Sequence, residues 1–185
     1  YGPALLFETC PGNDKVMKLY ADAAKYKFTY SLTTVVYGFM PNFTDFTVVK
    51  DHMPGLNFST IADVNHYHTD LDNFSNVNPK SIQHYGAQVL PVAMKYLTTE
   101  AYSDVDYFRA DRDATNFSIP ALGLFNFTKI QYVILNAVIC LLFLILFGLE
   151  GVRGRIKASK VFKNSISVLL IGIGSFFVSH LKITE

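Results

Sequence analysis

Tyr67, His68 and Thr69 lie together in a polar stretch that continues with two acids, Asp70 and Asp72. A neutral imidazole nitrogen is a common zinc ligand, and a nearby carboxylate can fix the tautomer of the ring. The phenol beside the imidazole can donate a hydrogen bond to a developing oxyanion. These residue types are what a metal-assisted hydrolase needs. The alternative reading is a loop histidine that is solvated or purely structural.

Other short motifs occur in a set order along the same part of the chain. They are Gly2–Thr9, Pro11–Asn13, Pro41–Val48, Pro54–Phe58, Tyr67–Thr69, Asp72–Asn73 and Ser81–Gly86. In this order they resemble the C-terminal half of the co-catalytic di-zinc exopeptidases. That family includes bacterial aminopeptidases, glutamate carboxypeptidase and the transferrin-receptor ectodomain. The resemblance is strongest to the membrane-bound branch of vacuolar and endoplasmic-reticulum proteases. It covers residues 1 to about 100 well and residues 101–185 more loosely.

The resemblance implies a role for each candidate site residue. His68 corresponds to a histidine that binds one of two zinc ions, and Tyr67 to a phenol that stabilises the tetrahedral intermediate, with a packing role as the alternative. Asp72 is expected to hydrogen-bond within the loop or to support the site from behind the ligand. Asp45 lies in a motif that shapes the substrate side of the site in relatives, although a simple helix cap explains it equally well.

The rest of the family's machinery is not in this sequence. The resemblance places a His-x-Asp pair, an adjacent Glu-Glu pair and a further acidic ligand before Tyr1. Glu8 is therefore not taken as the general base. Two zinc ions are implied for a complete domain, but only one well-motivated ligand lies here. We expect a fragment that is inactive alone and whose partners are a peptide substrate, the lipid bilayer and the missing N-terminal half of the same polypeptide.

Two uncharged runs follow the candidate peptidase part. Residues 130–149 contain no charged side chain, and at 1.5 Å per residue they match a hydrocarbon core of roughly 30 Å. Residues 165–181 form a shorter second run. We expect transmembrane helices at 128–150 and 164–182, joined by a loop at 151–163. Glu150–Lys163 holds five basic residues against one acid, which indicates a cytoplasmic loop, with the peptidase part extracellular or lumenal. A solvated basic turn without orientation meaning is the alternative.

The pattern of the first hundred residues predicts an α/β fold. Short apolar runs at 4–8 and 56–61 read as strands. Helices are expected from Asn13 or Asp14 to about residue 25, over residues 46–52 with Asp45 as the cap, and from Asn78-Pro79 to about residue 97. The last of these is expected to bury Ile82, Tyr85, Val89, Val92, Ala93 and Tyr96, with His84 on it as a structural residue. Alternation of strands and helices predicts a mostly parallel sheet with flanking helices over residues 1–100. Residues 101–127 are expected to form a linker or membrane-proximal stem with one strand or interfacial segment, because an apolar run follows at 119–125.

Composition narrows the function further. A net charge of +1 gives no basis for nucleic-acid binding, and two isolated cysteines form no disulfide framework. The resemblance implies a membrane-anchored zinc exopeptidase as the parent; an aminopeptidase is favoured, and a carboxypeptidase stays open. Two alternatives remain: a catalytically inactive peptidase-like ectodomain used for binding, and an unrelated multi-span membrane protein.

Overall fold

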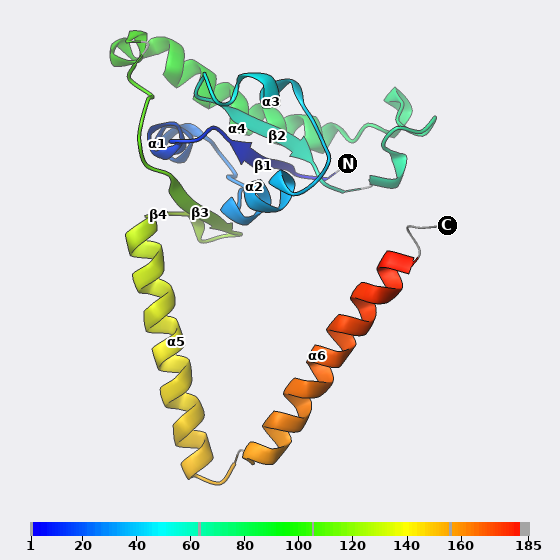
Figure 1. Cartoon of the computed structure of the whole chain (residues 1–185). Coiled ribbons are helices and arrows are strands. Elements are labelled where there is room, and N and C mark those ends of the chain that lie inside the picture. The colour runs from blue at the N-terminus through cyan, green and yellow to red at the C-terminus, as the bar shows by residue number, and fades with distance from the viewer. Residues whose placement is uncertain (1, 63, 105, 156, 182–185) are drawn as a thin grey trace. The chain divides into compact units, whose positions relative to one another are not determined.

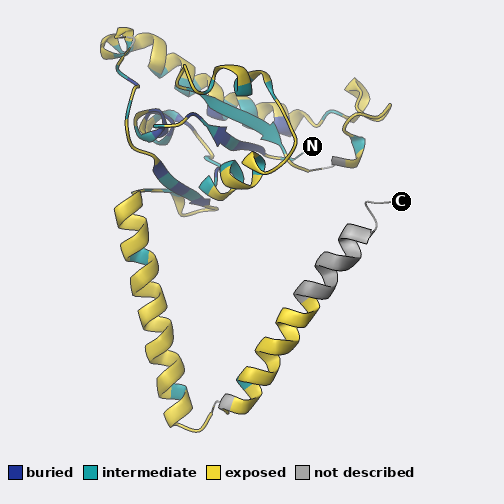
Figure 2. Cartoon of the chain, in the orientation of Figure 1, coloured by how far each residue is buried: buried dark blue, intermediate teal, exposed yellow. Residues whose placement is uncertain are grey.

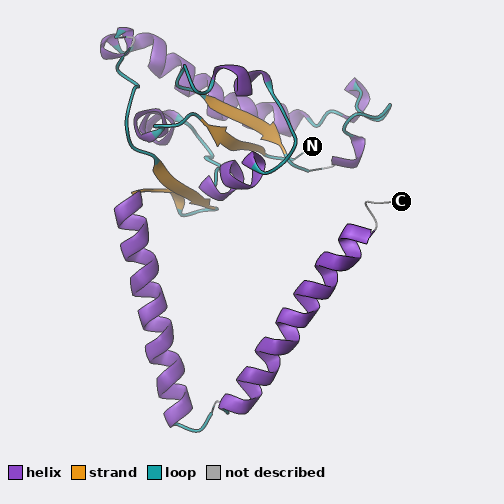
Figure 3. Ribbon diagram, in the orientation of Figure 1, coloured by secondary structure: helices purple, strands orange, loops and turns teal. Residues whose placement is uncertain are grey.

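The computed structural model describes the backbone of residues 2–62, 64–104, 106–155 and 157–181, but not the side chains of residues 64, 158 and 172–181. The chain divides into two compact units, Tyr1–Tyr132 and Val133–Glu185. Figures 1 and 3 show the elements. In chain order they are β1 (Ala4–Thr9), α1 (Asp14–Ala23), α2 (Ser31–Gly38), α3 (Asp45–Val49), β2 (Leu56–Thr60), the 3-10 turns η1 (Val64–His66) and η2 (Phe74–Asn76), α4 (Pro79–Thr98), η3 (Glu100–Ser103), β3 (Ala114–Ile119), β4 (Gly123–Thr128), α5 (Lys129–Val152) and α6 (Ala158–Leu181).

The strands of the first unit form two antiparallel pairs, β1 with β2 and β3 with β4. Residues 28–30 connect the pairs. The Leu6 N–H donates to the Phe28 carbonyl at 2.9 Å, and the Ser118 N–H donates to the Thr29 carbonyl at 2.9 Å. The prediction of a mostly parallel sheet is therefore wrong for the described strands, where parallel pairing is confined to a bridge between Leu6 and Thr29. Three helices separate β1 from β2, and a connection of this length allows the second strand to run in either direction.

Strand β1 lies at the centre of the core because helices cover both of its faces. Leu6 packs in a buried cluster with Met17 and Tyr20 of α1. Phe7 meets Tyr37 of α2 edge to face, with 4.8 Å between the ring centroids. Burial is concentrated in β1, α1 and β3 (Figure 2). The mixed α/β character expected from the sequence is confirmed.

Helix α4 begins as the sequence predicts. The Asn78 side chain accepts from the Lys80 N–H at 2.9 Å, and Pro79 occupies the first helical position. Its buried face differs from the expected set of Ile82, Tyr85, Val89, Val92, Ala93 and Tyr96. Ser81 and Gln88 are buried instead, and Ile82 and Val89 are exposed. Gln88 faces β1 because its amide hydrogen-bonds to the β1 backbone, so a polar side chain takes the place expected for an apolar one.

Residues 101–127, expected as a linker, contain η3 and the β3–β4 hairpin. The residues before β3 also complete the N-terminus of α1. The Asp113 carboxylate accepts from the Gly12 N–H at 2.8 Å, and the Arg112 carbonyl accepts from the Asp14 N–H at 3.2 Å. The Asn13 side chain makes no cap bond and instead accepts from the Ala114 N–H at 2.7 Å. This segment therefore belongs structurally to the first unit.

Helix α5 is the one helix among the described residues that is long and apolar enough to cross a membrane, judged by length and composition. It starts directly after β4, where Thr128 and Gln131 form reciprocal bonds between their side chains and backbone N–H groups. Helix α6 has the same length of 24 residues. The expected second membrane span, 164–182, lies partly outside the described residues, because residue 182 and the side chains of 172–181 are not described.

Candidate active-site loop

The loop between β2 and α4 carries Tyr67, His68 and Asp72. It folds into successive tight turns. The Thr69 hydroxyl donates to the His66 carbonyl at 2.7 Å, and the Asp72 N–H donates to the Thr69 carbonyl at 2.9 Å. Further along, the Asn76 amide donates to the Leu71 carbonyl at 2.9 Å. These bonds give the loop a defined shape, although most of its side chains face solvent.

Tyr67 and His68 present their rings side by side. The ring centroids lie 3.9 Å apart with an interplanar angle of 26°. His68 has a φ of 58°, in the left-handed region that residues other than glycine rarely occupy. Tyr67 is 67% exposed. Both side chains are therefore accessible to a ligand, and the backbone of His68 holds an uncommon conformation.

Asp45 and Asp72 occupy different elements. Asp72 is exposed in the same loop as Tyr67 and His68, whereas Asp45 is exposed at the first residue of α3. The sequence predicted Asp45 as the cap of a helix over residues 46–52, but the cap is Thr44. The Thr47 hydroxyl accepts from the Thr44 N–H at 3.1 Å, and α3 ends at Val49. Among the described residues, no hydrogen bond joins Asp45 to Tyr67 or His68.

Among the described residues, side chains that could bind a metal ion do not gather at one place. Within the part of the chain that the structure describes, no three His, Cys, Asp or Glu side chains come together in a group that could hold a metal ion. A protein zinc site uses three or four ligands in fixed geometry. The residues present therefore do not by themselves fit a zinc site, and His68 is the single donor that the sequence nominated.

A buried polar network around Glu8 was missed by the sequence reasoning. The Glu8 side chain is 2% exposed, and its Oε1 lies 2.8 Å from the Lys50 Nζ. Its Oε2 accepts from the Asn57 Nδ2 at 3.0 Å, and the same nitrogen donates to the Thr44 hydroxyl at 3.0 Å. The hydrogen bond to Glu8 raises the pKa of the Lys50 amine above its ordinary value. An acid inside an otherwise apolar strand was the signal for such a network, because a buried carboxylate needs partners.

A second polar cluster ties α4 to β1. The Ala4 N–H donates to the His84 Nδ1 at 3.0 Å, and the Gln88 Nε2 donates to the Ala4 carbonyl at 2.7 Å. The Tyr20 hydroxyl donates to the Gln88 Oε1 and accepts from the Phe28 N–H. Burial raises the pKa of Tyr20. His84, which the sequence placed on a helix as a structural residue, holds the end of β1 here.

The sequence of this chain matches a known protein family. The family profile described as peptidase family M28 matches residues 1–93. This segment includes Glu8, Asp45, the loop with Tyr67 and His68, and most of α4. The β3–β4 hairpin and both long C-terminal helices lie outside it.

The chain is also similar to curated proteins named endoplasmic reticulum metallopeptidase 1. It is 27% identical to the Rattus norvegicus protein over 187 residues and 26% identical to the Homo sapiens protein over 184 residues. Each of these matches covers 96% of this chain and 20% of the relative. The chain thus spans about a fifth of the length of the curated relatives it matches. No solved structure matches.

Proposed function

The chain belongs to peptidase family M28, and from that membership we propose that it forms the C-terminal part of a membrane-anchored zinc exopeptidase that hydrolyses peptides. The observation that carries the proposal is the exposed, stacked pair of Tyr67 and His68 on a turned loop inside the matched segment. A peptidase must present its reactive groups to an incoming chain, and the exposure of both residues on this loop supports such a role. The proposed specificity is for a free amino terminus. Membership in this family excludes the alternative of an unrelated multi-span membrane protein.

The proposed zinc site needs ligands beyond those of this chain. The imidazole of His68 would hold one coordination position, and the remaining ligands and the general base would come from other parts of the polypeptide. Zinc would supply the polarisation of the peptide carbonyl. The Tyr67 hydroxyl would donate a hydrogen bond to the carbonyl oxygen as it gains charge. Asp72 would support the loop, and Asp45 would lie on the substrate side.

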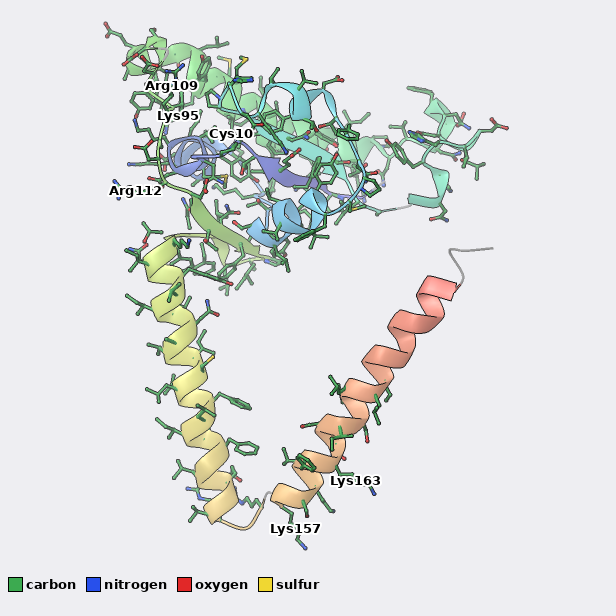
Figure 4. The ribbon with its side chains drawn as sticks, in the orientation of Figure 1. Cys10, Lys95, Arg109, Arg112, Lys157 and Lys163 are labelled. Carbon is green, nitrogen blue, oxygen red and sulfur yellow. The ribbon has the colours of Figure 1, made fainter. Side chains whose placement is uncertain are left out.

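The proposed location follows from α5 and the segment after it. We propose that α5 and α6 form a transmembrane hairpin and that the peptidase part lies in a lumen or outside the cell. The Glu150 carboxylate, near the end of α5, lies 3.0 Å from the guanidinium of Arg153 and 3.3 Å from that of Arg155, both in the connecting segment. Lys157 lies immediately before α6 and Lys163 near its beginning (Figure 4). An excess of basic residues in a short loop supports a cytoplasmic side for this segment.

The test uses the full-length polypeptide that contains this chain. His68→Ala should lower the bound zinc and abolish hydrolysis of aminopeptidase substrates. His52→Ala is the matched control, because His52 is also exposed but lies outside the loop, and it should retain both. Near-normal activity with full zinc in His68→Ala would rule out His68 as a ligand. A wild-type protein that binds peptides without turnover would instead indicate an inactive ectodomain used for binding.

A further inference from the structure

Helix α3 is too short to hold its own position. It has five residues and buries none of them fully. An isolated helix of this length is unstable in water, because one turn fixes several backbone angles for few hydrogen bonds. What keeps Asp45 in place must therefore come from contacts at the ends of the helix and from the packing of single side chains.

Both ends of α3 are connected to one buried carboxylate. Lys50, the C-cap residue, pairs with the Glu8 Oε1 at 2.8 Å. Thr44, the N-cap residue, accepts from the Asn57 Nδ2, and that nitrogen also donates to the Glu8 Oε2. Glu8 therefore reaches the C-terminal end of the helix directly and the N-terminal end through one amide. We call these four residues, Glu8, Thr44, Lys50 and Asn57, the α3 clamp.

A packing contact of Phe46 fixes one side of the helix. Phe46 packs against the buried cluster of Cys10, Val16, Leu19 and Phe108. Its ring also lies over Gly55, where an added Cβ would come within 2.3 Å of the ring. The apolar contact holds one side of α3, and the clamp holds its two ends. Asp45 is left exposed at the first turn.

We propose that Glu8 is a positioning residue for peptide binding, which acts by holding α3 and thereby Asp45 in place. This inference rests on the proposed function, in which Asp45 lies on the substrate side. Glu8 itself is buried and does not touch the peptide. Its effect is transmitted through Lys50 and Asn57.

The choice of substitution follows from the two oxygens of Glu8. Glu8→Gln keeps an acceptor for Asn57 but turns an amide N–H₂ toward the Lys50 amine, so the bond at the C-terminal end is lost. Lys50→Gln removes the same bond from the other side. Lys50 is 30% exposed, so this change alters a less buried position. Lys50→Arg keeps a cation that can reach Glu8 and serves as the conservative variant.

A matched control is a buried residue of α4 that bonds to the same strand. Gln88 is also buried and hydrogen-bonds to β1, but it connects β1 to α4 rather than to α3. Gln88→Leu should therefore lower the melting temperature without changing the position of α3. It separates loss of stability from loss of positioning.

The experiment compares these variants in the full-length polypeptide. Glu8→Gln and Lys50→Gln should raise the KM for peptides by about 5- to 30-fold, the range that corresponds to one or two kcal/mol, with kcat within about twofold. Lys50→Arg should restore most of the KM, and Gln88→Leu should leave it unchanged. Amide hydrogen exchange of residues 45–50 should accelerate in Glu8→Gln and Lys50→Gln only.

Each outcome decides the proposal. An unchanged KM with a lowered melting temperature would show that Glu8 is only structural, and unchanged exchange over residues 45–50 would show that it does not hold α3. If Glu8→Gln does not fold, Lys50→Gln gives the same readouts. A wild-type protein without peptidase turnover would overturn the proposed function, whereas the exchange and the peptide affinity would still test the clamp.

Discussion

At the scale of single residues, the hydroxyl of Tyr67 is the group whose removal is most informative. Tyr67→Phe keeps the ring and its stacking on His68, so only the hydroxyl is lost. If the hydroxyl donates to an oxyanion, the bond strengthens in the transition state, and kcat should fall by about 10²- to 10³-fold while KM changes little. Steady-state kinetics of the full-length protein measure this. A change confined to KM would contradict an oxyanion role.

Tyr20 links stability to pH. Burial raises its pKa above the ordinary value of 10.0, so the folded state keeps the phenol proton when the unfolded chain has lost it. The stability from this group is fully present below pH 10 and decreases as the pH rises above it, by up to about 1.4 kcal/mol per pH unit. Tyr85 and Cys10 shift in the same direction and add to the alkaline loss.

Tyr20→Phe should separate these contributions. At neutral pH the variant should be less stable by about 1–3 kcal/mol, because the Gln88 Oε1 and the Phe28 N–H lose their partner. Between pH 10 and 12 its free energy of unfolding should fall less steeply than that of the wild type. Urea unfolding of the chain in detergent at several pH values measures both effects. Equal slopes would show that Tyr20 does not control the alkaline loss.

At the scale of elements, features set by neighbouring residues could be predicted from the sequence, whereas the pairing of strands could not. The start of α4 was predictable because Asn78 and Pro79 act within one turn. The direction of β2 was not, because hydrophobic patterns do not encode how a chain returns across three helices. The prediction of the buried face of α4 was wrong for a related reason. Gln88 is buried because it bonds to Ala4 and Tyr20, which are distant from it in sequence.

The residues of the candidate site also fall into those that the sequence could predict and those that it could not. Tyr67, His68 and Asp45 could be nominated because their motifs are local. The α3 clamp could not be, because it joins residues 8, 44, 50 and 57 through the antiparallel pairing of β1 and β2. A buried acid in a strand indicates that a partner exists, but it does not identify the partner.

Pro91 in the interior of α4 gives an element-scale prediction. Proline has no N–H, so the Ala87 carbonyl one turn earlier lacks its helical donor. That carbonyl accepts from the Lys25 N–H, just after α1, at 3.1 Å. Pro91→Ala would normally stabilise a helix by about 3 kcal/mol. Here the gain should be well below that value, because the new N–H competes with Lys25 for the same oxygen.

Amide exchange at Lys25 is the direct readout for Pro91→Ala. Exchange should accelerate in the variant, while exchange in the first turns of α4 should stay the same. A full gain in the free energy of unfolding together with unchanged Lys25 exchange would show that Pro91 is not needed for the hydrogen bond between the Lys25 N–H and the Ala87 carbonyl.

At the scale of the whole molecule, the peptidase part continues into α5 without a separate linker. Residues 101–127 were expected to form a linker, but β3 pairs with β4 and also bonds to residues 28–30 of the sheet. Thr128 ends β4 and begins α5 through its bonds with Gln131. The alternating apolar residues of this segment carried a strand signal, but its partner at Thr29 is 89 positions away from Ser118 in the sequence.

The role of α5 as a membrane anchor is testable in the intact protein. Leu141 and Leu144 are exposed near the middle of this helix. An arginine at the centre of a membrane span costs about 2.5–3.5 kcal/mol on insertion scales, so Leu141→Arg combined with Leu144→Arg should abolish stable insertion. The matched control is Leu141→Ala with Leu144→Ala, which shortens both side chains without adding charge. Resistance of the protein to alkaline extraction from membranes is the readout. We expect the arginine variant to become extractable and the alanine variant to stay in the membrane. If the arginine variant remained inserted, α6 or parts of the polypeptide beyond this chain would have to provide the anchor, and α5 would not be required for it.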